Sequence, residues 1–165
     1  MATPLDAVDV RILQLLQHDA RLTNKEIADK LSKSVTAVYD RIRRLETEGY
    51  IKGYVALLDK EMIGKNLIGY ITVRLKEHSQ AGLRNFQKEV AKFPEAMECY
   101  QMAGESDFLI KVAIGDMIEY NEFLMNKLST LPNIGVVQTS FVLSEAKRET
   151  AYPLSLPAPA RKTRG

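Results

Sequence analysis

The stretch SVTAVYDRIRRLE, residues 34–46, decides how the N-terminal third of the chain folds. Four of its apolar residues, Val35, Val38, Ile42 and Leu45, recur at the spacing of one helix face, which predicts that they are buried together. The opposite face and its flanks carry short polar, aromatic and charged side chains: Thr36, Ala37, Tyr39, Asp40, Arg41, Arg43 and Arg44. We therefore expect a helix over about residues 35–48, with one face in a core and an arginine-rich face exposed.

Two further helices are predicted upstream of this stretch. Asp6 can cap a helix whose apolar residues recur at helical spacing as far as residue 16. Thr23 and Glu26 form a capping-box pair that begins a short second helix ending near residue 31. Only the polar residues 32–34 separate this helix from the third. Two helices joined by so short a turn meet at a steep angle, as in a helix-turn-helix.

Residues 49–57 complete the first domain. Gly49 ends the third helix, and residues 50–57 are expected to form a small β wing. A helix that enters the major groove of DNA presents its N-terminal residues to the base edges and its cations to the phosphates. The candidate DNA-binding residues are Ser34, Thr36, Ala37, Tyr39, Asp40, Arg41, Arg43 and Arg44.

An alternative interpretation of the arginines is that they only keep an exposed helix soluble. Asp40 also opposes phosphate binding, unless it pairs with an arginine or accepts a hydrogen bond from cytosine. The ordered set of three helices, a tight turn and a wing favours DNA binding.

Five short motifs in the first domain resemble the leucine-responsive regulator/AsnC (feast/famine) family of transcriptional regulators. They are LDxxDxxIL from residue 5, DAR at 19–21, IA at 27–28, SxxxVxxRIxxLE at 34–46 and GYIxGY at 49–54. No single motif is specific, but their order and spacing together are. The chain departs from the family at the turn, where Ser32 and Lys33 replace the usual glycine and apolar residue.

The periodicity changes after a polar connection at residues 59–66. Leu67, Gly69, Ile71, Val73 and Leu75 alternate along one face of a strand. The segments that follow predict a helix, a strand pair, a second helix and a last strand: residues 83–93, 97–103 with 108–114, 116–131, and 136–143. In the second helix Met117, Tyr120, Leu124, Leu128 and Leu131 are expected to face inward. The order βαββαβ predicts a ferredoxin-like α+β domain with both helices on one sheet face.

The other face of this sheet is predicted to associate with a second copy of the chain. Ile68 and Tyr70 lie opposite Leu67 and Gly69, so apolar or aromatic residues occupy both faces of the first strand. An uncovered apolar face is typical of an interface, and a symmetric dimer is its commonest form. A dimer also suits DNA half-sites about 34 Å apart. The family resemblance implies that dimers assemble further into octamers.

The same resemblance implies an amino-acid effector site around Gly104-x-x-Asp107. Backbone N–H groups of this link could receive the carboxylate of an amino acid, and Asp107 could pair with its ammonium group. Carried over by position, the candidate effector-binding residues are Gln101, Gly104, Glu105, Ser106, Asp107, Met117, Ser140 and Phe141. Glycine and aspartate in a short strand link are also ordinary turn residues.

Composition excludes several other functions. The 165 residues carry a net charge of +2, so DNA binding needs a local basic surface rather than a basic chain. One cysteine, Cys99, and two separated histidines, His18 and His78, offer neither a disulfide framework nor a metal site. The sequence contains no glycine-rich phosphate loop and no paired-carboxylate spacing, and neither a signal peptide nor a membrane-spanning segment is expected. No cofactor other than an amino-acid effector, and no enzymatic activity, is expected.

These observations predict an oligomeric, sequence-specific transcriptional regulator of the cytoplasm and nucleoid, modulated by an amino acid. Its expected parts are a winged helix-turn-helix domain (1–60), a linker (61–66), an oligomerisation and effector domain (67–150) and a mobile basic tail (151–165). Two alternatives stay open. One is a haem-biosynthesis decarboxylase, since some of these enzymes resemble the same two-domain architecture; the other is an assembly module without DNA binding.

Overall fold

The computed structural model describes residues 3–156, which form two compact units. Of the described residues, the first unit contains 3–56 together with 147–156, and the second is Leu57–Ala146. Residues 147–156 therefore belong to the same unit as residues 3–56. The basic stretch 161–164 lies outside the described residues.

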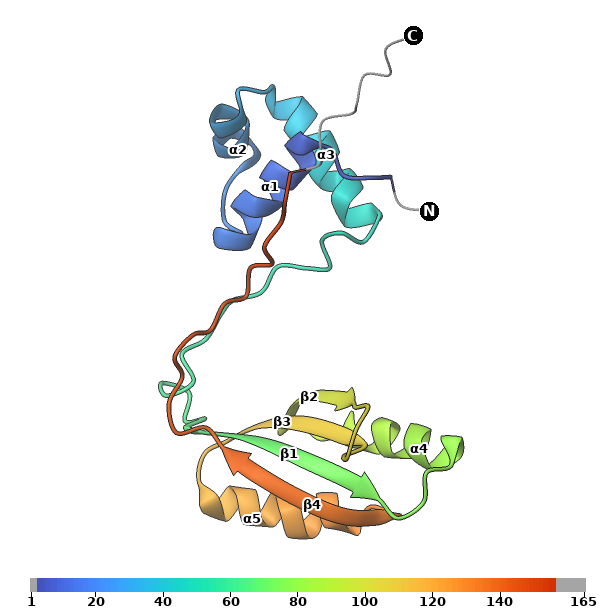
Figure 1. Ribbon diagram of the computed structural model, residues 1–165. Helices are drawn as coiled ribbons and strands as arrows, with labels where there is room; N and C mark the ends of the chain where they lie inside the picture. Colours follow the sequence, from blue (N-terminus) through green and yellow to red (C-terminus); the bar gives the residue numbers. More distant parts are fainter. Residues whose placement is uncertain (1–2, 157–165) are drawn as a thin grey trace. The chain divides into compact units, whose positions relative to one another are not determined.

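Three helices make up the first unit: α1 (Ala7–His18), α2 (Asn24–Leu31) and α3 (Val35–Thr47) (Figure 1). Capping boxes at Asp6/Asp9 and Thr23/Glu26 begin α1 and α2. The buried core consists of Ile12, Leu13, Leu16, Ile27, Ala28, Val38, Ile42 and Leu45. This confirms the three predicted helices.

In the turn between α2 and α3, Ser32 occupies the position where the family usually has glycine. Ser32 has φ 51° and ψ 50°, the left-handed conformation that usually favours glycine. The N–H of Lys33 donates to the carbonyl of Ala28 at 3.0 Å, which closes the end of α2. Ser34 then caps α3 by accepting from the N–H of Ala37 at 3.2 Å. Val35, predicted to be buried, is 47% exposed because it lies in the first turn of α3, beyond the core.

Residues 50–57 differ from the β wing expected there, since they carry no strand. A strand needs a neighbour for its backbone hydrogen bonds, and no described residue of the chain pairs with this segment. The N–H of Ile51 donates instead to the carbonyl of Leu45 at 3.1 Å, and the hydroxyl of Tyr54 donates to Glu46 Oε1 at 2.8 Å. Burial and this carboxylate together raise the pKa of Tyr54 to about 12.

The second unit has the predicted βαββαβ order. Its elements are β1 (Leu67–Leu75), α4 (Gln80–Val90), β2 (Ala96–Gln101), β3 (Phe108–Ile114), α5 (Met117–Asn126), a short 3-10 helix η1 (Leu128–Thr130) and β4 (Ile134–Phe141) (Figure 1). The antiparallel sheet has the strand order β2-β3-β1-β4. This confirms the ferredoxin-like fold.

Both helices pack on one face of the sheet. That face supplies Ile71, Val73, Leu75, Phe108, Ile110, Val112 and Ile114 to the core, and the helical segments add Phe86, Val90, Tyr120, Phe123 and Leu128. One inward residue differs from the prediction: Met117 is 55% exposed and Phe123 is buried instead. Met117 is the first residue of α5, and a side chain in a first turn points back past the helix start rather than onto the sheet.

The opposite face of the sheet carries aromatic, apolar and charged side chains. The register pairs Tyr70 with Lys111 on one side and with Ser140 on the other, and it pairs Arg74 with Val136. Tyr70, Tyr100 and Val136 are exposed there. Within the described unit, therefore, the face that was predicted to be uncovered does lie away from both helices.

Candidate DNA-binding surface and effector cavity

Between residues 36 and 43, α3 presents an exposed surface. Thr36, Ala37, Tyr39, Asp40 and Arg43 are all exposed, whereas Val38 and Ile42 between them anchor the helix in the core. The Ser34 side chain is committed to capping the helix. Five of the eight predicted DNA-binding side chains thus share one accessible surface, which carries small and hydrogen-bonding groups, one cation and one carboxylate.

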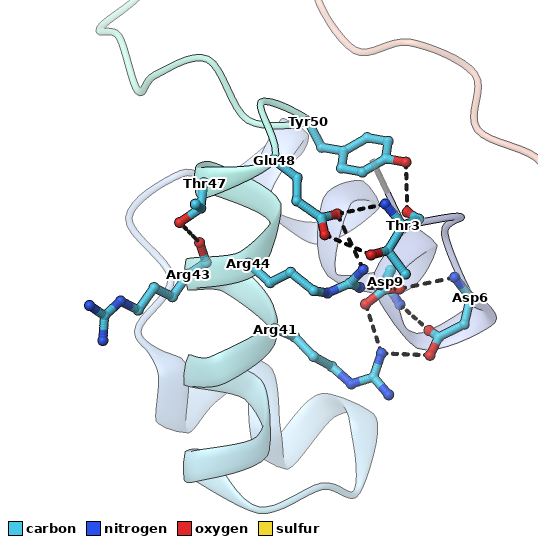
Figure 2. Close-up of polar contacts among 9 residues, drawn as sticks. All are labelled: Thr3, Asp6, Asp9, Arg41, Arg43, Arg44, Thr47, Glu48 and Tyr50. Atoms are coloured by element: carbon cyan, nitrogen blue, oxygen red, sulfur yellow. Dashed lines mark hydrogen bonds and ion pairs between the residues drawn. The ribbon is translucent and has the colours of Figure 1, made fainter. Parts of the chain in front are cut away.

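Arg43, the arginine of this surface, has no ion pair among residues 3–156. Figure 2 shows its side chain extended away from the cluster formed by Arg41 and Arg44. Its backbone carbonyl accepts a hydrogen bond from Thr47 Oγ1 at 2.8 Å, which holds the last turn of α3. The guanidinium is therefore available to a phosphate or to a guanine edge.

Arg41 and Arg44 are bound within the domain. The Nη1 of Arg41 lies 2.6 Å from Asp6 Oδ2 and 2.7 Å from Asp9 Oδ1. The Nη2 of Arg44 lies 2.6 Å from Asp9 Oδ2 (Figure 2). Asp9 is 1% exposed, and it also accepts from the N–H of Asp6 at 2.9 Å. A buried carboxylate on α1 thus binds two arginines of α3, a contact that fixes the angle between these helices.

The cluster extends to the end of α3 and the N-terminal segment. Glu48 Oε2 lies 3.5 Å from Arg44 Nη1 and also accepts from the N–H of Thr3 at 3.2 Å (Figure 2). Thr3 Oγ1 donates to Glu48 Oε1, and the hydroxyl of Tyr50 donates to the carbonyl of Thr3, at 2.7 and 2.8 Å. We call the set Thr3, Asp6, Asp9, Arg41, Arg44, Glu48 and Tyr50 the Asp9 network.

Two pKa values reflect this network. Burial would raise the pKa of Asp6, but the N–H of Asp9 and the Arg41 guanidinium outweigh it and lower the pKa. The hydrogen bond from Arg41 to Asp6 raises the pKa of the arginine. Both groups are therefore held in their charged forms.

The sequence analysis identified Asp9 only as part of the LDxxDxxIL motif, with no partner on the third helix. The available signal was the spacing of Arg41 and Arg44, three apart and next to the core face of α3. Their partner could not be identified, because the contact joins residues more than thirty positions apart.

A cavity of about 310 Å³ opens in the second unit beside the link between β2 and β3. Its lining combines two predicted effector-binding residues with four from the exposed sheet face: Glu105, Ser106, Thr72, Arg74, Val136 and Gln138. Neither Arg74 nor Glu105 has an ion pair within the described residues. Gly104, with φ 142°, allows the sharp bend that brings this link to the sheet.

Asp107 has a structural role beside the cavity. Its Oδ2 accepts from the N–H of Leu75 at 2.7 Å and lies 3.1 Å from His78 Nε2. Its own N–H donates to the carbonyl of Val73 at 2.9 Å. The carboxylate is therefore already bound at the end of β1.

The remaining predicted effector residues lie elsewhere on the sheet. Gln101 Oε1 accepts from Gln87 Nε2 of α4 at 3.2 Å, on the helix side. Ser140 pairs with Tyr70, and Phe141 packs edge-on against Tyr120 with ring centres 4.9 Å apart. Phe141 is paired with Gly69 of β1, whereas Phe108, which follows the 104–107 link, is paired with Val73. Within one subunit, residues 140–141 and the 104–107 link therefore lie at different positions along β1. Met117 follows β3, whose last residue, Ile114, pairs with Leu67 at the far end of β1 from this link.

Other chemistries find no support in the described residues. Residues 3–156 contain no group of three or more His, Cys, Asp or Glu side chains placed to hold a metal ion. Burial raises the pKa of the Cys99 thiol, which disfavours its nucleophilic thiolate form. No helix within the described chain has the length and apolar character needed to cross a membrane.

Comparisons with known proteins match both units. The winged helix-turn-helix DNA-binding family matches residues 5–52, and the Lrp/AsnC ligand binding domain matches residues 68–152. The chain is 34% identical over 150 residues to the Bkd operon transcriptional regulator of Pseudomonas aeruginosa, covering 91% of this chain and 98% of that protein. It is 40% identical over 154 residues to the glutamate uptake regulatory protein of Zymomonas mobilis, covering 93% of each.

Solved structures agree with these relatives. A transcriptional regulator of Neisseria meningitidis in complex with L-methionine superposes with a TM-score of 0.86 at 33% identity, over 91% of this chain and 97% of that one. An AsnC family transcriptional regulator of Agrobacterium tumefaciens gives 0.86 at 32% identity, over 90% and 97%. Fold and relatives together define a class of transcriptional regulators that join a helix-turn-helix to a ligand-binding domain.

The chain belongs to the Lrp/AsnC family of transcriptional regulators. The comparisons support DNA-binding regulation over the haem-biosynthesis enzyme, since the relatives are named as transcriptional regulators.

Proposed function

We propose that α3 is the DNA-reading helix and that Thr36, Ala37, Tyr39 and Arg43 contact the DNA. The observation that carries this proposal is the exposed surface of α3 between residues 36 and 43, on a helix held in place by the Asp9 network. Small side chains allow the backbone to approach the bases, and Arg43 can make a bidentate contact with guanine or bind a phosphate. In this proposal Ser34 fixes the helix start, Asp40 accepts from a base, and Arg41 and Arg44 orient α3 rather than bind phosphate.

Binding of fluorescent DNA fragments that include the chain's own promoter tests this proposal. Arg43→Ala is expected to weaken specific binding about tenfold or more, because a bidentate guanine contact contributes about 1–3 kcal/mol. Arg84→Ala removes an equal charge from an exposed position on α4 of the second unit and is expected to leave affinity within about twofold. Equal affinity of wild type and Arg43→Ala would exclude Arg43 from the interface.

The exposed sheet face is proposed as the dimer contact, centred on Tyr70 and Tyr100. Exposed aromatic side chains are typical of interfaces, and a two-fold dimer would present two α3 helices to two half-sites. Assembly of dimers into octamers is the form that the family resemblance implies. Sedimentation velocity of the Tyr70→Glu variant tests this contact, and the variant is expected to dissociate to monomers. An unchanged sedimentation coefficient would place the dimer contact elsewhere.

An amino acid is the proposed effector, bound in the Glu105/Arg74 cavity at the margin of this face. Arg74 could pair with the ligand carboxylate and Glu105 with its ammonium group, while Thr72, Ser106 and Gln138 offer hydrogen bonds. The methionine complex of the Neisseria meningitidis relative supports this class of ligand. Residues 117 and 140–141, which lie at the other end of the sheet, could then line the ligand from a neighbouring subunit.

Calorimetric titration with L-methionine and a panel of other amino acids tests the effector site. Arg74→Gln and Glu105→Gln are expected to abolish the binding seen for wild type, whereas Arg84→Gln, an exposed arginine on α4, is expected to retain it. An effector that shifts DNA affinity would do so by about 5–150-fold, the usual range of allosteric coupling. Unaltered binding by both cavity variants would contradict this assignment.

The protein is further proposed to act by binding alone, without a catalytic cofactor, and at the nucleoid in the cytoplasm. The names of its relatives, which are regulators rather than enzymes, support this.

A further inference from the structure

The C-terminal segment Tyr152–Leu154 docks on α1 of the DNA-binding unit. Gln17 makes two reciprocal hydrogen bonds to Tyr152: its Oε1 accepts from the backbone N–H at 2.7 Å, and its Nε2 donates to the carbonyl at 3.2 Å. Gln14 Nε2 donates to the carbonyl of Leu154 at 2.9 Å. Part of the region expected to be a mobile tail is therefore bound to the helical unit.

This contact has the geometry of a specific docking site. Gln14 and Gln17 are three apart on α1 and share a face, and residues 152 and 154 present the same edge of an extended chain. Between them Pro153 restricts the backbone, so that less conformational entropy is lost when the segment is ordered. Leu154 packs against the core of the three helices. The segment is held by hydrogen bonds from the glutamine side chains to its backbone and by the apolar contact of Leu154.

The docked segment gives the DNA-binding unit a second connection to the sheet. β1 and β4 are neighbours, and the N–H of Val142 donates to the carbonyl of Ile68 at 2.9 Å, so both connections leave the sheet side by side. One reaches the first unit after α3, where Ile51 packs on the helical core. The other reaches α1 through residues 152–154. A body held at one point can rotate freely, whereas a body held at two points keeps only rotation about the line that joins them.

We propose that residues 152–154 are a positioning anchor that limits the orientations of the DNA-binding unit and thereby sets the half-site spacing that the protein accepts. The spacing argument rests on the proposed function, a dimer that reads two half-sites with α3. The anchor acts on α1, and the Asp9 network joins α1 to α3, so the orientation of α1 determines that of the reading helix. Gln14, Gln17 and Leu154 are positioning residues in this account and do not touch DNA.

Two full-length variants release the anchor in different ways. Leu154→Asp places a charge against the helical core, and the double variant Gln14→Ala with Gln17→Ala removes the backbone bonds while leaving the core intact. Leu156→Asp is the matched control, since it adds the same charge two residues further on at an exposed position. Thermal unfolding establishes that each variant is folded.

The first readout is binding to synthetic operators whose half-site separation is varied in single base pairs across one helical turn, about 10.5 base pairs. Wild type and Leu156→Asp are expected to bind one separation at least about tenfold more tightly than a separation half a turn away. Both anchor variants are expected to lose affinity at the best separation and to flatten the profile to within about threefold. A purely structural role would instead weaken binding equally at all separations, and that result would overturn the proposal.

The second readout does not require DNA. Relaxation of backbone ¹⁵N nuclei measures how fast residues 7–47 tumble, and both anchor variants are expected to shorten this correlation time relative to wild type and Leu156→Asp. Unchanged tumbling would overturn the anchor. If tumbling changes as expected but wild type binds no operator at any separation, the proposed DNA-binding function fails while the anchor stands.

Discussion

Two parts of the molecule bring opposite charges together in different ways. In the Asp9 network Arg41 and Arg44 of α3 pair with carboxylates of their own domain, Asp6 and the buried Asp9, at distances of 2.6–2.7 Å. In the cavity of the second unit Arg74 and Glu105 line one space, and neither has an ion pair within the described residues. Charges that satisfy each other fix a structure, whereas unpaired charges of both signs around one cavity suit a zwitterionic ligand.

The comparison also separates arginines that the sequence pattern groups together. Arg41, Arg43 and Arg44 occupy the same stretch of α3, but only Arg43 is free of an ion pair in the described chain. A count of basic residues on a helix therefore overestimates the cations available to DNA.

Replacing the centre of the Asp9 network should have the largest effect on stability. Asp9→Asn keeps the shape but removes the charge that pairs with both arginines, so the DNA-binding unit should lose about 3 kcal/mol, near the lower limit for breaking a buried ion pair because the guanidiniums can still reach water. The melting temperature of that unit, measured by calorimetry, should fall by about 10–20 °C. The exposed Asp40→Asn is the control, and a melting temperature shared by both variants would mean that the network is not stabilising.

Replacing Arg44 and Arg43 separately by alanine sharpens the comparison. Arg44→Ala should lower the melting temperature of the first unit, by less than Asp9→Asn because Arg41 keeps its bonds to Asp6 and Asp9. Arg43→Ala should leave the melting temperature unchanged and weaken DNA binding instead. The paired measurements are thermal unfolding and DNA affinity; a loss of affinity in Arg44→Ala that exceeds the one in Arg43→Ala, with no loss of stability, would reverse the assignment.

The same contrast applies to two acidic residues beside the cavity. Asp107→Ala removes the acceptor of the Leu75 N–H, so it should destabilise the second unit by about 1 kcal/mol. Glu105→Gln should leave the stability of that unit unchanged within about 0.5 kcal/mol, because Glu105 is exposed. Denaturant unfolding measures both. Equal destabilisation would show that Glu105 too is part of the framework of the loop.

Protonation of Asp6 in acid should have the smallest effect on the stability of the first unit. The pKa of Asp6 is lowered in the folded state, so its contribution to stability is complete above the unfolded value of about 4 and is lost as the pH falls through the folded value. Unfolding of the first unit between pH 6 and pH 3, compared for wild type and Asp6→Asn, measures this contribution. The two stability curves should begin to converge as the pH falls below about 4; parallel curves would contradict it.

Local patterns were sufficient for most of the fold. The spacing of Val38, Ile42 and Leu45 predicted the core face of α3, and the alternation from Leu67 to Leu75 predicted the inward face of β1. Such periodicities come from residues close in sequence, which is why they can be read without coordinates. The β wing is not formed because a strand requires a partner, and a sequence pattern shows only one side of that pairing.

The candidate sites were less predictable. The surface of α3 was found from the exposed positions between core residues, whereas the saturation of Arg41 and Arg44 by Asp9 was not. Glu105 and Ser106 were named for the effector site, but Arg74, Thr72, Val136 and Gln138 were not, since strand pairing alone brings them to the same cavity.

The sequence by itself determined the family and, apart from the β wing expected at 50–57, the helices and strands of the two units, since these depend on local periodicity, capping and turn residues. Only the tertiary structure decided which charges are already paired, which residues line the cavity, and that the C-terminal segment returns to α1. These features depend on contacts between residues 32 to 140 positions apart, whose partners are set by how the elements pack rather than by any one segment.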